Sequence, residues 1–82
     1  MRWIARLRRE GLKMTQAQLA QILGVHAMTV SKWERGELRP TRYQVALLGN
    51  FKIASELDPE AGARAVEGLE GGGAVDGLYR LL

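Results

Sequence analysis

The chain has 82 residues, which is enough for one small domain but too few for a buried multi-residue active site with its supporting shell. It contains no cysteine, which excludes a disulfide scaffold and a thiolate metal site and fits a reducing cytoplasm. The net charge of +3 is uneven, because residues 1–52 carry +7 and residues 53–82 carry −4, so the first part suits nucleic acid and the second does not.

The first predicted element is a helix over residues 2–10, with Ile4 and Leu7 facing inward and Gly11 as its stop. Its apolar residues alternate with charged ones, unlike the core of a signal peptide. No stretch of the chain approaches the apolar length of a membrane span, so no membrane association is expected. Charge runs are usually solvated, so the arginines of this helix are expected on its exposed side: Arg2, Arg6 and Arg8.

The next elements are two short helices, over residues 16–23 and 27–34, joined by a tight turn at Gly24. Thr15 and Gln18 have the spacing of a capping box, in which each side chain bonds the backbone amide of the other residue. Met14 and Leu19 add a hydrophobic staple around this start. The pattern is that of a helix-turn-helix, which makes reading of duplex DNA the leading function.

The second of these helices has two different sides. Val30 and Trp33 fall on one side and are expected to pack against the first helix of the motif. Glu34 lies at the edge of that side, and a cation on the preceding helix is its expected partner. The opposite side carries small, apolar and cationic residues and no carboxylate, which suits a negatively charged surface: Ala27, Met28, Ser31, Lys32 and Arg35.

A loop from Gly36 to Pro40 is followed by a predicted helix over residues 42–56, which begins at a second capping box formed by Thr41 and Gln44. Gly49 lies inside this helix and costs about 1 kcal/mol relative to alanine, which indicates a close packing contact or a kink. The apolar spacing marks two sides of the helix, one with Val45, Leu48 and Lys52 and another with Ala46, Leu47 and Ile53.

The C-terminal part predicts a fifth helix, which starts at Asp58-Pro59-Glu60 and ends at the glycines 71–73. The last segment, 74–82, is too short to be a stable helix unless it docks, either on its own fourth helix or on a second protomer. We therefore expect a DNA-binding domain over residues 1–57 and a dimerisation or partner-binding extension over residues 58–82. The apolar residues of the last segment follow helical spacing: Val75, Leu78, Leu81 and Leu82.

Several strings of the sequence together resemble the Cro and phage-repressor (Xre-type) transcriptional regulators. They are Arg9-Glu10-Gly11-Leu12, Met14-Thr15-Gln16, Leu19-Ala20, Leu23-Gly24-Val25, the run from Thr29 to Gly36, and Arg39-Pro40. The resemblance covers residues 1 to about 57 and implies an all-α, compact bundle of four or five helices with residues 27–34 as the recognition helix. It also implies that Gln16 bonds a phosphate and that Arg9 pairs with Glu34.

The chain departs from this family at the start of the recognition helix, where it has His26, Ala27 and Met28. These departures affect the expected base preference and leave the expected mode of binding unchanged. His26 is expected to act as a weak cap or a turn residue.

These features predict a transcriptional regulator, a repressor, that binds double-stranded DNA as a homodimer on a two-fold operator. Ser31 and Lys32 are expected to bond base edges, and Ala27 and Met28 to make apolar contacts with them. No catalysis, metal or cofactor is expected, since a lone histidine without nearby carboxylates gives no basis for one. The residues expected on phosphates are Gln16, Thr29, Arg35, Arg39 and Arg42.

The sequence also bears on two other classes of protein. An antitoxin of the same fold would bind a protein partner, a toxin or another effector, through its tail and regulate its own operon, and the sequence does not distinguish it from a separate repressor. A DNA-processing enzyme would need paired carboxylates on one helical face, and the sequence offers none.

Overall fold

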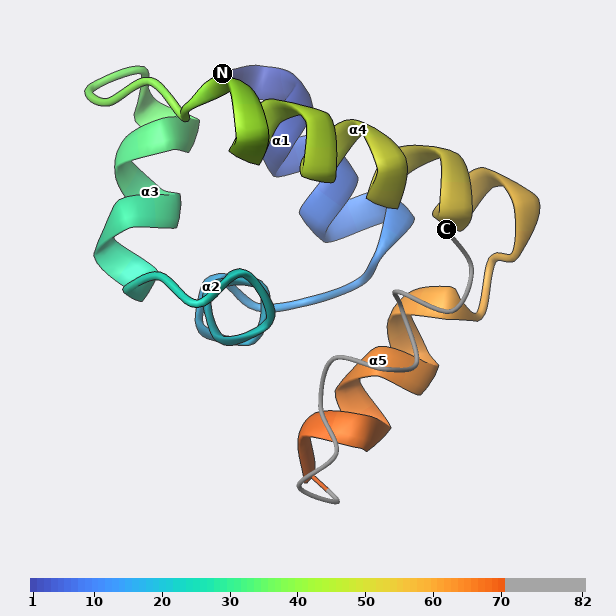
Figure 1. Cartoon of the computed structure of the whole chain (residues 1–82). Helices are drawn as coiled ribbons and strands as arrows, with labels where there is room; N and C mark the ends of the chain where they lie inside the picture. Colours follow the sequence, from blue (N-terminus) through green and yellow to red (C-terminus); the bar gives the residue numbers. More distant parts are fainter. Residues whose placement is uncertain (71–82) are drawn as a thin grey trace.

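The computed structural model describes residues 1–70, and all elements in this part of the chain are helices, as expected for an all-α fold (Figure 1). None of these helices is long and apolar enough to cross a membrane. The last segment, 74–82, and its expected docking lie outside the described residues. The elements are α1 (Arg2–Arg6), the π-helix η1 (Leu7–Gly11), α2 (Gln16–Leu23), α3 (Ala27–Arg35), α4 (Arg42–Leu57) and α5 (Ala61–Glu70).

The first helix changes its winding halfway along. After α1 the chain continues as a π-helix, in which the amide of Leu12 donates to the carbonyl of Leu7, five residues earlier, at 2.7 Å. Gly11 is the last residue of the π-helix. A Cβ atom on this residue would lie only 3.0 Å from Ser55 Oγ of α4. The glycine therefore lets η1 approach α4 closely.

The helix-turn-helix begins and ends as its sequence predicts. The Gln18 amide donates to Thr15 Oγ1 at 3.1 Å and the Thr15 amide donates to Gln18 Oε1 at 2.9 Å, which confirms the capping box. Gly24 ends α2 with φ of 71°, a left-handed conformation that favours glycine. Within the described residues, His26 makes no side-chain capping bond at the start of α3, as expected of a weak cap.

One hydrophobic core joins all the elements. Val30 and Trp33 of α3 are buried, as predicted, and so are Met14 and Leu19 around the start of α2. In α4 neither of the two predicted sides matches the buried one, which consists of Leu48, Phe51 and Ala54. The core cluster contains Ile4, Leu7, Leu12, Met14, Leu19, Ala20, Ile22, Val30, Trp33, Leu48, Phe51, Ala61 and Ala65.

The last described helix, α5, belongs to this core. It starts two residues later than the predicted first helical position, Pro59, because Asp58 and the following residues form a turn in which Asp58 Oδ1 accepts from the Glu60 amide at 3.0 Å. Ala61 and Ala65 are fully buried. Small residues on this side of α5 therefore let its backbone approach the rest of the bundle.

Two glycines inside helices are expected to respond in opposite ways to alanine substitution. A Cβ atom on Gly62 would overlap the backbone carbonyl of Leu12, whereas one on Gly49 would meet no atom of the described residues within 4 Å. The close packing contact considered for Gly49 is therefore absent from this part of the chain. We expect Gly62→Ala to destabilise the fold by at least about 1–3 kcal/mol, the usual cost of overpacking.

The matched control is Gly49→Ala, which should stabilise the fold by up to about 1 kcal/mol because alanine is the better helix former. Urea denaturation of both variants measures the two effects. Equal stability of the variants would contradict the close approach of α5 to Leu12.

Candidate nucleic-acid interface

Helix α3 presents one side to solvent and is held by the other. Val30 and Trp33 have exposed fractions of 0% and 1%, so they fix the helix on the core. Met28 is 59% exposed, so its adaptable apolar side chain is open to a partner. Of the residues predicted to read bases, Ala27, Met28 and Lys32 are exposed and Ser31 is half-buried.

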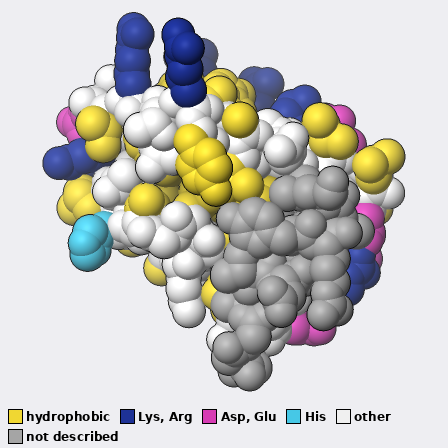
Figure 2. All heavy atoms as spheres, in the orientation of Figure 1, with side chains coloured by type: hydrophobic (Ala, Val, Ile, Leu, Met, Phe, Trp, Pro, Cys, Tyr) yellow, Lys and Arg dark blue, Asp and Glu magenta, His cyan; other side chains and the backbone are white. Residues whose placement is uncertain are grey.

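The arginines predicted to bind phosphate lie at the end of α3 and in the residues after it. Arg35 pairs with Glu37 at 2.9 Å across the surface, and its Nη2 atom also lies 3.8 Å from the sulfur of Met28. Arg39 in the loop and Arg42 at the start of α4 are exposed. Figure 2 shows Lys and Arg side chains projecting at the upper left, above α3 and the start of α4, so this end of the molecule is positively charged.

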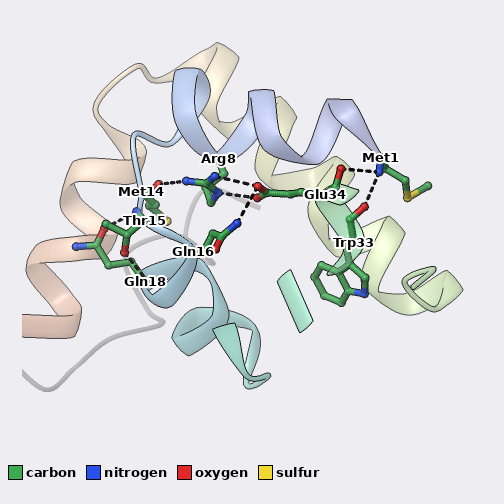
Figure 3. Close-up of polar contacts among 8 residues, drawn as sticks. All are labelled: Met1, Arg8, Met14, Thr15, Gln16, Gln18, Trp33 and Glu34. Carbon is green, nitrogen blue, oxygen red and sulfur yellow. Dashed lines mark hydrogen bonds and ion pairs between the residues drawn. The ribbon is translucent and has the colours of Figure 1, made fainter. Parts of the chain in front are cut away.

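A buried ion pair lies behind α3 (Figure 3). Arg8 of η1 donates from Nε to Glu34 Oε2 at 2.6 Å and from Nη2 to Glu34 Oε1 at 2.9 Å. Its Nη1 atom donates to the carbonyl of Met14 at 3.0 Å. The side chains of Arg8 and Glu34 are only 8% and 7% exposed, so the bidentate pair connects the first helix, the start of the motif and α3 away from water.

The pairing of Arg9 with Glu34 that the resemblance implied is wrong, and so is the expectation that Arg8 lies on a solvated face. In an ideal helix Arg8 lies about 40° from the buried Ile4, whereas Arg9 lies about 140° from it. Helical phase was therefore the signal that could have identified Arg8. The preceding helix α2 supplies no cation to Glu34 among the described residues, but it does supply the amide of Gln16.

The pair is charged in the folded protein. The hydrogen bonds from Arg8 hold the pKa of Glu34 below its ordinary value of 4.5, and the bond from Gln16 and the positive charges of Arg8 and Arg9 act in the same direction, against the effect of burial. The hydrogen bond to Glu34 likewise raises the pKa of Arg8. Both groups thus keep the charges on which their attraction depends.

Gln16 connects this buried pair with the surface. Its Nε2 atom donates to Glu34 Oε1 at 3.1 Å, which fixes the side chain at the first residue of α2. An amide nitrogen carries two hydrogens, so Gln16 can hold Glu34 and still donate to a phosphate. The N-terminal end of a helix favours an anion at this place.

The start of α1 also holds α3. The backbone nitrogen of Met1 donates to the carbonyl of Trp33 and contacts the carbonyl of Glu34 at 3.4 Å (Figure 3). Carbonyl groups at the end of a helix need such donors. Contacts at both ends of the first helix therefore fix the orientation of α3.

The buried Arg8–Glu34 pair and the bond from Gln16 hold α2 and α3 together, and α3 leaves one side exposed. This arrangement is that of a DNA-binding helix-turn-helix. A helix-turn-helix family model matches residues 4–48, more than half of the chain, and the chain belongs to this Xre-type family of DNA-binding transcriptional regulators. It is similar to the HTH-type transcriptional regulator DicA of Escherichia coli (strain K12), with 50% identity over 36 residues. The match covers 44% of this chain and 27% of that regulator. No solved structure matches the chain significantly.

Proposed function

We propose that the protein is a repressor that recognises a specific sequence in double-stranded DNA, acting in the cytoplasm as a homodimer on a two-fold operator. The observation that carries this proposal is the exposed side of α3, where a cation and apolar side chains stand on a helix fixed by buried Trp33 and Val30. A fixed helix of this kind can enter the major groove without further rearrangement.

Four residues of α3 are proposed to read bases. Lys32 is exposed and can donate to the O6 and N7 acceptors of guanine, and the Ser31 hydroxyl can bond a neighbouring base edge. Ala27 and Met28 offer apolar surface that suits the methyl group of thymine. Their exposure supports this assignment, and the half-buried position of Ser31 restricts its reach.

A second group of residues is proposed to position the protein on the DNA backbone. Gln16 and Thr29 would bond phosphates beside the groove, Gln16 while it is held by Glu34. Arg35 is the last residue of the recognition helix, and Arg39 and Arg42 follow it in the chain. All three would bind phosphates that flank the groove. Arg35 would exchange its exposed pairing with Glu37 for a phosphate, at small cost because exposed ion pairs contribute little.

The size of the module supports a two-fold arrangement. A single domain of this class buries only about 600–1,000 Å² of protein surface on DNA, which limits its specific affinity. Two copies related by a two-fold axis place two recognition helices in successive major grooves, about 34 Å apart.

Selection of bound sites from a random pool of duplex DNA tests the proposal. We expect enrichment of two inverted half-sites with centres about 10 base pairs apart, or a multiple of that spacing. Enrichment of a single half-site would contradict the homodimer, and a pool without enrichment would contradict sequence-specific binding altogether.

A further inference from the structure

Helix α4 carries an exposed stripe that the core does not use. We call it the α4 seam and define it as Tyr43, Ala46, Asn50, Ile53 and Leu57. All five residues are exposed, and the three large apolar ones have exposed fractions of 73% (Tyr43), 55% (Ile53) and 78% (Leu57). Figure 2 shows hydrophobic side chains at the surface at the upper right, over the C-terminal half of α4. Large apolar side chains gathered on one helix side mark an interaction surface.

The spacing of the α4 seam matches two heptads of a coiled coil. Its residues follow one another at intervals of three and four, so Tyr43, Asn50 and Leu57 occupy a positions of a heptad and Ala46 and Ile53 occupy d positions. The side of α4 that faces the protein's own core uses other residues, centred on Leu48 and Phe51. The seam borders this buried side at Ala54, so α4 has a second apolar side that is open to a neighbour.

We propose that the α4 seam pairs in parallel with the α4 seam of a second copy of this chain. This proposal rests on the proposed function, which requires a two-fold dimer. Asn50 indicates the occupant, because a single asparagine at an a position meets its own copy across a parallel two-stranded coiled coil and fixes the register there.

The position of α3 indicates the parallel orientation. A short loop, residues 36–41, joins the C-terminal end of α3 to the N-terminal end of α4, and Figure 1 shows α3 toward that end of α4. Parallel pairing therefore brings both recognition helices to the same end of the dimer, where one face of a duplex can meet both. An antiparallel pair would place them at opposite ends. Ala46, near the recognition end, is small and lets the two helices approach each other there.

Sedimentation of the full chain without DNA tests the proposed surface. The wild type should show a monomer–dimer equilibrium, and Ile53→Glu should weaken it by about 30-fold or more, the effect of a hot-spot residue. The matched control is Leu38→Glu, which places the same charge at an apolar residue of the α3–α4 loop that is 45% exposed and lies outside the seam. This control should dimerise like the wild type.

Two results would overturn the proposal. A wild type that stays monomeric at every concentration would show that the seam does not associate. An Ile53→Glu variant that dimerises like the wild type, with an unchanged circular dichroism spectrum, would move the interface elsewhere, with residues 71–82 as the next candidate.

The register has its own test, because the chain has no cysteine and a single introduced one is unique. Leu57→Cys should give a covalent dimer on oxidation, since only parallel pairing brings residue 57 next to its copy. In an antiparallel pair, residue 43 would lie next to residue 57 of the other copy. A disulfide that forms only in a mixture of the Tyr43→Cys and Leu57→Cys variants, and in neither variant alone, would therefore overturn the proposal. Asn50→Leu should tighten association and admit larger oligomers; weaker association of Asn50→Leu would contradict an asparagine within the seam.

These measurements are independent of DNA recognition. If the seam dimerises as described but site selection enriches no sequence, the proposed function fails and the surface stands. If Ile53→Glu is a folded monomer that still binds one half-site, both proposals are supported.

Discussion

Replacing Glu34 with alanine is expected to destabilise the fold by about 3–5 kcal/mol, the usual cost of leaving a buried charge without its partner. The side chain of Arg8 is only 8% exposed, and its guanidinium would keep the Met14 carbonyl as an acceptor while losing the carboxylate. In a domain of this size each kcal/mol lowers the melting temperature by about 4–8 °C. The variant should therefore melt more than about 10 °C below the wild type in a thermal scan.

The matched control for this prediction is Arg9→Ala. Arg9 is exposed and influences Glu34 through its charge, so its removal should change stability by no more than about 0.5 kcal/mol. If Arg9→Ala were as damaging as Glu34→Ala, the assignment of Arg8 as the partner would be wrong.

The pH dependence of the same pair has a defined sign. Since the pKa of Glu34 is lowered from 4.5 by folding, its stabilising effect is complete above that value and is lost as the pH falls through the folded-state pKa. The difference in stability between the wild type and Glu34→Gln should therefore narrow below about pH 4.5. A difference that stays constant down to pH 3 would show that Glu34 is uncharged or unpaired.

The second large effect concerns salt. If the three arginines of each protomer neutralise about three phosphates, or about six in the dimer, raising the salt concentration from about 50 to 200 mM should weaken binding to the operator by at least about 10³. The reason is that cations on the protein release counterions from the duplex, and added salt opposes that release. Titration of a labelled duplex at several salt concentrations measures the slope.

Arg39→Ala should reduce that slope by about one contact per protomer and leave the preferred sequence unchanged. The control for it is Arg64→Ala, an exposed arginine of α5 that pairs with Asp58 away from α3. A salt response that is flat, or that falls equally for both variants, would contradict the phosphate assignment.

Local sequence patterns predicted the helix-turn-helix well because its boundaries depend on neighbouring residues. The capping boxes at Thr15 and Thr41 and the left-handed glycine at Gly24 each involve groups within a few residues of one another. Such interactions are the same in a short segment as in the folded bundle. The inward position of Val30 and Trp33 follows from helical period alone.

The errors concern contacts between helices. Choosing Arg8 over Arg9 as the partner of Glu34 depends on the phase of the first helix relative to α3, and the switch to π winding at Leu7 does not follow from local preference. The close approach of Gly62 to Leu12 depends on where a fifth helix packs. The buried side of α4, with Phe51, also depends on its neighbours, since this helix has a second apolar side at the α4 seam.

The central claim is that α3 reads DNA sequence, and a binding assay with two variants, Lys32→Ala and Arg42→Ala, tests it. Each variant is titrated with the selected operator, with operators that carry single base changes and with unrelated duplex DNA. Lys32→Ala should lose about 1–3 kcal/mol of discrimination at one base pair of each half-site and bind unrelated DNA only slightly more weakly. Arg42→Ala should bind all duplexes more weakly by a similar factor and keep its base preferences. Loss of affinity for all sequences alike in both variants, with discrimination unchanged at every position, would contradict the reading of bases by α3.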